Sequence, residues 1–332
     1  FQVVDRATNG LEALDLLSRK QYDAVVLDVN MPKMNGLELL KELQKFKISA
    51  KVMMASTDTR EGAKTTLDAL ELGALDFVHK PDNAVDCRTN DFRETMLETL
   101  AAVADAKAPV FTTEAKKKEE EATTRKMVEI VQKSAKSVTG NKVVALACST
   151  GGPKALQSVI PKLPKGLKSP VVIVQHMPKG FTASLAERLN TLSEVNVKEA
   201  QEGDVLQPGW VYLAMGGMHL NVKTGRDGKY TIHYSDEPSR EGVKPCANYM
   251  YESLQNSQFD EIVCVVMTGM GADGTVGIKN LKASKKVHVI AQDQETSTVY
   301  GMPRSVVNAG LSDRIVPLEE IAQEIILNVG VK

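Results

Sequence analysis

Short apolar runs alternate with amphipathic segments along the chain, and this alternation restricts the possible folds more than any other feature. Apolar runs of about four to eight residues between polar ones are typical of buried strands, whereas apolar residues every three or four positions are typical of helices. From the N-terminus we predict, in turn, helices and strands at residues 10–19, 22–28, 36–44, 51–55, 60–72 and 76–79. This order predicts an α/β domain with a parallel sheet over residues 1–106.

A second alternating region covers residues 142–332. Its predicted strands lie at residues 143–148, 171–176, 211–214, 262–267 and 287–292, and its predicted helices at residues 153–162, 181–191, 248–256, 275–283 and 318–328. A glycine-rich tetrapeptide that begins at Gly225 separates residues 219–222 from residues 230–233, which predicts a β-hairpin. We therefore expect a doubly wound α/β domain that carries an antiparallel hairpin.

The segment between these regions, residues 107–141, has a different composition. Three lysines and then three glutamates occupy residues 116–121, a charge pattern that is typical of a solvated linker or an exposed helix. Apolar residues at 128–131 indicate that part of this segment forms an amphipathic helix. The sequence thus predicts two domains that are joined by a charged linker.

The bulk composition excludes several classes of function. A formal net charge of −1 gives no argument for nucleic-acid binding, and no apolar run approaches the roughly 20 residues of a membrane helix. The four cysteines are scattered without the spacing of metal ligands, at positions Cys87, Cys148, Cys246 and Cys264. We expect reduced thiols, no structural metal and a cytoplasmic location.

Asp28, Ser56 and Lys80 each lie where a predicted strand of the first region ends. The carboxyl ends of parallel strands border the crevice in which such sheets bind ligands, so these side chains are expected near one another. The carboxylate can accept a phosphoryl group, the hydroxyl can hydrogen-bond a phosphoryl oxygen, and the ammonium can neutralise its charge. Each residue alone could be a turn or helix cap or a solvated charge, but the three together favour a phosphoryl-acceptor site.

The segments around Asp28 and Lys80, residues 27–36 and 73–81, resemble the response-regulator receiver family. The resemblance implies a flavodoxin-like fold, phosphorylation of Asp28 by a chemotaxis histidine kinase, and Mg²⁺ as the cofactor of that reaction. Members of the family open with a strand that ends in an acidic pair, which helps to hold Mg²⁺. Residues 1–4 correspond instead to their second strand, so we expect a receiver without its first strand, its first helix and the acidic pair.

In the second region, Ser149 follows the predicted strand at residues 143–148 and precedes two glycines and Pro153. Proline is favoured at the first position of a helix, which places the serine beside a helix N-terminus. Free backbone N–H groups at such an end can stabilise an oxyanion, so Ser149 is a candidate nucleophile. Alternatively, Ser149 only caps the helix, or the adjacent Cys148 is the nucleophile.

His176 and Asp273 follow two other predicted strands of this region. A histidine at this edge could accept the serine proton, and the carboxylate could orient the imidazole, as in a Ser-His-Asp triad. His176 could instead be satisfied by backbone groups alone. A G-x-S-x-G elbow is missing, which argues against the common esterase fold but not against this chemistry.

The loop that contains Asp273 also fits a second pattern. Gly269, Gly271 and Gly274 form G-x-G-x-x-G after a strand, and Asp293 ends the next strand, as in a dinucleotide-binding fingerprint. Two observations weigh against this interpretation. Asp273 would place a carboxylate beside the pyrophosphate, and the motif comes late in its domain rather than opening it.

The resemblance to a known family decides between these interpretations. Three segments resemble the three motif blocks of the CheB methylesterase family, at residues 149–153, 174–181 and 267–274, and residues 291–293 and 301–304 fit its C-terminal part. By this resemblance Ser149 is the nucleophile, His176 the general base and then acid, and Asp273 the orienting carboxylate. It also implies an oxyanion donor at the Met270 backbone and support for the histidine from Thr150.

The same resemblance implies the reaction and the partners. The family hydrolyses glutamate methyl esters on chemotaxis receptors with release of methanol, and some members deamidate receptor glutamines, with no cofactor for catalysis. The receiver is expected to cover the catalytic crevice until it is phosphorylated. The alternative is an inactive scaffold that only docks to receptors.

Overall fold

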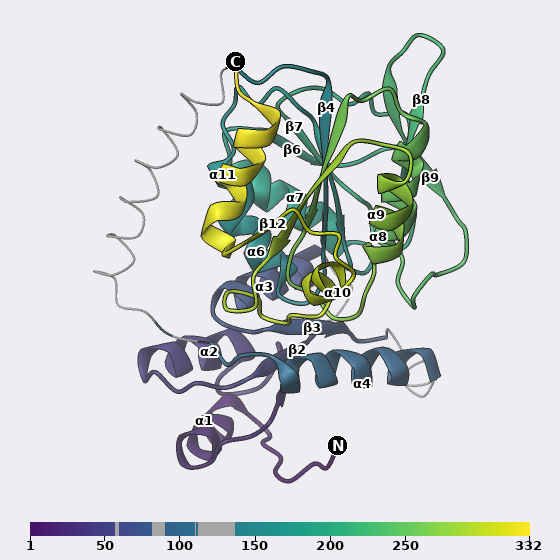
Figure 1. Ribbon diagram of the computed structural model, residues 1–332. Coiled ribbons are helices and arrows are strands. Elements are labelled where there is room, and N and C mark those ends of the chain that lie inside the picture. The colour runs from purple at the N-terminus through teal and green to yellow at the C-terminus, as the bar shows by residue number, and fades with distance from the viewer. Residues whose placement is uncertain (57–59, 82–89, 110, 112–136) are drawn as a thin grey trace. The chain divides into compact units, whose positions relative to one another are not determined.

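The computed structural model describes residues 1–56, 60–81, 90–109, 111 and 137–332 (Figure 1). The chain divides into two units, Phe1–Glu114 and Ala115–Lys332. The charge block at residues 116–121, the apolar residues at 128–131 and Cys87 lie outside the described residues. Of the helices that are described, none is both long enough and apolar enough to cross a lipid bilayer.

The first unit contains a parallel three-stranded sheet in the order β1-β2-β3. Its elements are α1 (Gly10–Arg19), β1 (Val25–Asp28), α2 (Gly36–Lys45), β2 (Val52–Ser56), α3 (Arg60–Glu71), β3 (Asp76–His79) and α4 (Asn90–Asp105). Six of these elements were predicted from the sequence, and α4 was not. The predicted parallel α/β fold of this unit is confirmed.

The start of α2 illustrates how local sequence sets these boundaries. Asn35 accepts a hydrogen bond from the Glu38 N–H (2.9 Å), and the Glu38 carboxylate accepts one from the Asn35 N–H (2.8 Å). This reciprocal capping box satisfies two N–H groups that the first helical turn would otherwise leave free. The helix then buries Leu39 and Leu43 on one face, which fixes it against the rest of the unit.

One prediction for this unit is wrong. Residues 1–4 do not form a strand, and Phe1, Val3 and Val4 are exposed. A strand is stabilised by hydrogen bonds to a neighbouring strand. Among the described residues β1 pairs only with β2, so residues 1–4 have no strand beside them to join.

The second unit is built on a parallel seven-stranded sheet in the order β12-β11-β10-β4-β5-β7-β6. These strands are β4 (Lys142–Cys148), β5 (Val171–Gln175), β6 (Asn196–Glu199), β7 (Trp210–Leu213), β10 (Glu261–Val266), β11 (Val287–Gln292) and β12 (Arg314–Val316). Cys148 of β4 pairs with Gln175 of β5, and Ala147 pairs with Val266 of β10. The carboxyl ends of β4, β5 and β10 therefore lie side by side at one edge of the sheet.

Helices cover both faces of this sheet (Figure 1). One face carries α6 (Gly152–Val159), α7 (Phe181–Leu192) and α11 (Leu318–Val329), and the other carries α8 (Ala247–Ser253), α9 (Thr275–Lys282) and α10 (Met302–Asn308). Strands β8 (His219–Thr224) and β9 (Tyr230–Ser235) form the predicted antiparallel hairpin, which packs on α8. The predicted doubly wound fold with its hairpin is confirmed.

Three elements of this unit were not predicted: β6, β12 and α10. The strands are short edge strands of mixed polarity, and α10 has only seven residues, so none of them shows a long periodic pattern. Two predicted helices end in a single 3₁₀ turn, at Ile160–Lys162 and Leu254–Asn256.

The central strand predicts where stability depends on packing. Leu146 of β4 has 0% exposure, so Leu146→Ala should lower the free energy of unfolding by about 2–5 kcal/mol because it leaves a cavity. Leu327→Ala removes a side chain on α11 that is 40% exposed and should cost less than about 1 kcal/mol. Urea unfolding followed by the fluorescence of Trp210, the single tryptophan, measures both. Equal losses would contradict this account of the core.

Candidate active site

Ser149 is the first residue after the central strand β4. Its N–H donates to the Thr268 carbonyl at 2.9 Å, and its own carbonyl accepts from the Gly152 N–H at 2.7 Å. Gly151 has a φ of +77°, and a Cβ at this position would lie 2.5 Å from the Thr298 hydroxyl oxygen. This tight turn therefore requires glycine, and it presents Ser149 at the start of α6.

His176 lies directly beside this turn, at the end of β5. The backbone N–H of His176 donates to the Cys148 carbonyl at 3.1 Å. This bond links the end of β4, just before Ser149, to His176. The ring Nε2 is 2.8 Å from Asp273 Oδ2, and the two side chains are only 10% and 3% exposed. Neither His176 Nδ1 nor Ser149 Oγ has a hydrogen-bond partner in the described part of the chain. The structure thus places the three predicted residues at one edge of the sheet, with the histidine and aspartate bonded.

Asp273 is held by more donors than the sequence indicated. Besides His176, its carboxylate accepts hydrogen bonds from the N–H groups of Ala247 (2.6 Å) and Asn248 (3.0 Å) and from Cys246 Sγ (3.1 Å). Burial raises the pKa of Asp273, but the hydrogen bond and charge of His176, with the bonds from Ala247 and Cys246, lower it below its usual value. Asp273 is therefore a buried carboxylate that stays ionised and can stabilise an imidazolium.

The side chain of Asn248 fixes the loop that carries Asp273. Its Oδ1 accepts from the N–H groups of Gly274 (3.1 Å) and Gly277 (2.6 Å), and its Nδ2 donates to Glu241 (2.6 Å). The side chain is fully buried. The sequence did not predict the side-chain contributions of Asn248 and Cys246 or the backbone N–H groups of residues 247 and 248, because none of them lies in a recognised motif.

Several backbone N–H groups near Ser149 could stabilise an oxyanion. Within the described residues, the N–H groups of Thr150, Gly151 and Met270 have no acceptor. The Met270 loop is fixed because the Gly269 carbonyl accepts from the N–H groups of Gly301 (3.0 Å) and Met302 (2.8 Å). Thr150 is buried, and its carbonyl accepts from the Thr268 hydroxyl at 2.9 Å, but its own hydroxyl makes no hydrogen bond to His176.

The structure disfavours the alternative chemistries. Cys148 is fully buried, its thiol donates to Gln175 Oε1 at 3.1 Å, and burial raises its pKa, so it is a poor nucleophile. Asp293 accepts from the N–H (2.9 Å) and the hydroxyl (2.7 Å) of Thr296 within its own turn. The glycine-rich loop thus carries a buried carboxylate that is bonded to His176, which disfavours its interpretation as a cradle for a pyrophosphate.

In the first unit, the structure brings two of the three predicted phosphoryl-site residues together. Lys80 Nζ lies 2.9 and 2.8 Å from the two carboxylate oxygens of Asp28. The hydroxyl of Ser56 is buried and bonds elsewhere, accepting from Thr66 Oγ1 at 2.6 Å and donating to the Gly62 carbonyl. The side chain of Asp28 is 40% exposed and is already paired with Lys80, the cation expected to neutralise a phosphoryl group.

The residues around Asp28 do not fit a Mg²⁺ site. Asp28 is bound through both oxygens by Lys80, and the described residues contain no group of three or more His, Cys, Asp or Glu side chains that could hold a metal ion. Magnesium in proteins is coordinated mainly by oxygen ligands in an octahedral arrangement. With both of its oxygens bonded to Lys80, the Asp28 carboxylate is not open to Mg²⁺ in this arrangement.

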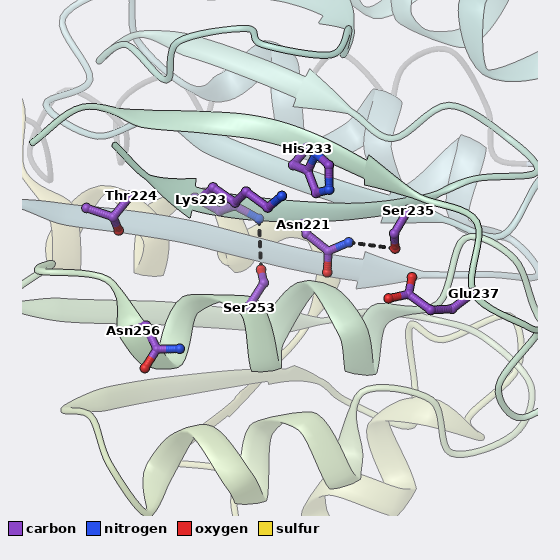
Figure 2. A pocket seen from close by; sticks show the side chains of 9 residues that line it. Asn221, Lys223, Thr224, His233, Ser235, Glu237, Ser253 and Asn256 are labelled. Atoms are coloured by element: carbon purple, nitrogen blue, oxygen red, sulfur yellow. Dashed lines mark hydrogen bonds between the residues drawn. The ribbon is translucent and has the colours of Figure 1, made fainter. Parts of the chain in front are cut away.

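A pocket of about 570 Å³ lies on the hairpin of the second unit (Figure 2). Residues of β8 and β9, with Glu237, Ser253 and Asn256, line it. Asp273 contacts the first residues of α8, whereas Ser253 is the last residue of that helix. The pocket is therefore separate from the proposed catalytic residues.

Known proteins share both units. The family model for CheB methylesterase matches residues 144–325, and that for the response regulator receiver domain matches residues 1–89. The chain is 40% identical over 330 residues to the protein-glutamate methylesterase/protein-glutamine glutaminase of Geobacillus kaustophilus (99% of this chain, 92% of the relative). It is 41% identical over 329 residues to the protein of the same name from Bacillus subtilis (98% and 90%). The crystal structure of the Thermotoga maritima CheB methylesterase catalytic domain matches with a TM-score of 0.54 and 40% identity (57% of this chain, 98% of that domain).

These similarities define a class of protein in which a response-regulator receiver precedes a hydrolase domain of the α/β type. The chain belongs to the CheB methylesterase family. The resemblance seen in its sequence motifs is thereby confirmed, while the domain limits and the roles of individual residues stay predictions.

The lowered pKa of Asp273 predicts how stability depends on pH. A carboxyl group whose pKa is lower in the folded state stabilises the fold above its unfolded pKa of about 3.9, and this stabilisation disappears as the pH falls through the folded value. Asp273→Asn should therefore lower the free energy of unfolding at neutral pH by at least about 1.5 kcal/mol. The difference from the parent should shrink as the pH falls below about 4.

Asp236→Asn is the matched control, because the side chain of Asp236 is 82% exposed. Removing its charge should change the free energy of unfolding little. Urea unfolding at several pH values measures both variants. If Asp273→Asn loses the same free energy of unfolding at every pH, the charge of Asp273 does not stabilise the fold.

Proposed function

We propose that this protein hydrolyses glutamate methyl esters on chemotaxis receptors, with Ser149, His176 and Asp273 as its catalytic triad. Protein-glutamine deamidation is the second reaction of the same site, as the names of the relatives suggest. The observation that carries the assignment is the buried hydrogen bond between His176 and Asp273 beside the Ser149 turn. The same proposal places the enzyme in the cytoplasm, where the described cysteines remain free thiols.

The geometry of the histidine defines the first chemical step. Because Nε2 donates to Asp273, the neutral ring carries its proton there, and Nδ1 has a free lone pair. Ser149 Oγ attacks the ester carbonyl carbon while its proton moves to His176 Nδ1. Asp273 stabilises the imidazolium that results, since it is ionised and buried.

The tetrahedral intermediate carries a negative oxygen that backbone donors can stabilise. The Met270 N–H is the donor that the family resemblance implies, and the N–H groups of Thr150 and Gly151 are further candidates. The intermediate collapses when the C–O bond breaks and His176 gives its proton to the departing methanol oxygen. Water then attacks the acyl-enzyme with the same proton relay and releases a receptor glutamate.

The receiver supplies regulation in this proposal. Asp28 takes a phosphoryl group from the chemotaxis histidine kinase, and Lys80 neutralises part of the added charge. A phosphoryl group adds about −1.5 to −2 charge to the site, a local change that can shift an equilibrium between inhibited and active states. Ser56 can hydrogen-bond a phosphoryl oxygen once its hydroxyl breaks its bond with Thr66, which requires a side-chain rotation.

The nucleophile is tested by Ser149→Ala. This variant should release methanol from methylated receptor membranes at least about 1,000-fold more slowly, because the attacking oxygen is lost, while it still binds the membranes. Ser158→Ala is the matched control, since Ser158 lies on the exposed side of α6 and bonds only the Lys154 carbonyl. Unchanged methanol release by Ser149→Ala would exclude the triad, and parent chains that bind receptors without releasing methanol would indicate a scaffold.

The phosphorylation site is tested by Asp28→Asn. Incubation of the full chain with the phosphorylated kinase should label the parent on Asp28, and the variant should take up no phosphate. Asp23 is an exposed residue just before β1, so Asp23→Asn should take up phosphate on Asp28 like the parent. Mass spectrometry of the phosphopeptides measures this, and label on a residue other than Asp28 would overturn the assignment.

A further inference from the structure

The last residue of β5, Gln175, has a buried side-chain amide beside the proposed triad. Gln175 is 1% exposed although it is polar, and it immediately precedes His176. A buried amide is costly unless its donors and acceptor are all bonded, so its partners indicate what it is there to hold.

The amide contacts the backbone of both proposed catalytic residues. Nε2 donates to the Ser149 carbonyl at 3.0 Å and to the His176 carbonyl at 3.1 Å, and Oε1 accepts from Cys148 Sγ at 3.1 Å. Both N–H groups of the amide are thus used, one on the backbone of Ser149 and the other on the backbone of His176. We propose that Gln175 is a positioning residue that sets the distance between Ser149 and His176.

The strand register explains why such a link is needed. The ladder between β4 and β5 ends at the pair Cys148–Gln175, and the His176 N–H to the Cys148 carbonyl is the last backbone bond between them. Beyond it the chain turns into α6 after Ser149 and toward α7 after His176. No further backbone bond between these two segments follows within the described residues. The Gln175 side chain therefore takes the place of the missing ladder bonds.

The amide packs directly against Gly152, the first residue of α6. A Cβ added to Gly152 would lie 2.0 Å from Gln175 Oε1 and 2.9 Å from its Cδ. Glycine at the first position of α6 is thus required by the Gln175 side chain. Gly152→Ala should displace the amide and reproduce the kinetic effect of a Gln175 substitution.

The inference rests on the proposed triad, and it is tested in the full chain with methylated receptor membranes as substrate. Gln175→Met keeps the length and burial of the side chain but removes both donors. Its kcat should fall about 10- to 100-fold, because displacements of about 1 Å between reacting groups have effects of this size. KM should stay within about twofold of the parent, since Gln175 is buried and would not touch the receptor.

Tyr212→Phe is the matched control for lost stability. Its hydroxyl donates a hydrogen bond at 2.8 Å to the Val205 carbonyl, on the hairpin side of the sheet, and is buried like the Gln175 amide. This variant should lose comparable thermal stability and keep the parent kcat. Should Gln175→Met keep kcat within about twofold of the control, or raise KM alone, the positioning role is overturned.

A second comparison separates this inference from the proposed triad. If Gln175 acts through Ser149 and His176, the double variant Ser149→Ala/Gln175→Met should be no slower than Ser149→Ala, because residues that act as a unit are not additive. An added loss equal to that of Gln175→Met alone would overturn the positioning role. Full activity of Ser149→Ala would instead overturn the triad, whatever Gln175→Met does. Gln175→Glu, which keeps an acceptor but places a carboxylate against two carbonyls, should also lower kcat, and parent-like kcat there would overturn the inference.

Discussion

The hydrogen bond between His176 and Asp273 is the interaction on which the site depends. It joins the end of β5 to the loop after β10, and the central strand β4 between them delivers Ser149. Because the three strands are parallel and end together, residues more than 120 positions apart meet at one edge. The cost of burying Asp273 is offset by four donors, which fixes the histidine tautomer as well as its position.

The sequence predicted the residues that lie at strand ends. It did not predict the contacts that other parts of the chain make with them. Long apolar runs such as Val171–Gln175 predicted strands, and polar residues that follow them predicted the site. The strand at residues 1–4 was predicted from the resemblance to the receiver family, although a strand also needs a partner beside it. The backbone donors of Ala247 and Asn248 carry no pattern, because any residue other than proline supplies a backbone N–H, and the Cys246 thiol lies outside any recognised motif. Gln175 could have been noticed as a polar residue inside a buried strand.

The two units illustrate two uses of the same edge of a parallel sheet. In the first, Asp28 is exposed enough to accept a group from outside, and Lys80 holds it. In the second, Asp273 is buried and its carboxylate is hydrogen-bonded to His176. In the proposed function, this difference in solvent exposure separates the carboxylate that accepts a phosphoryl group from the one that orients a base.

A serine-directed fluorophosphonate tests the central claim most directly, because it reports the reactivity of the nucleophile without a receptor. The full chain, labelled and then digested, should carry the adduct on the peptide that contains Ser149, and His176→Ala should abolish the labelling. An adduct on another residue, or equal labelling of Ser149 without the imidazole, would contradict the triad.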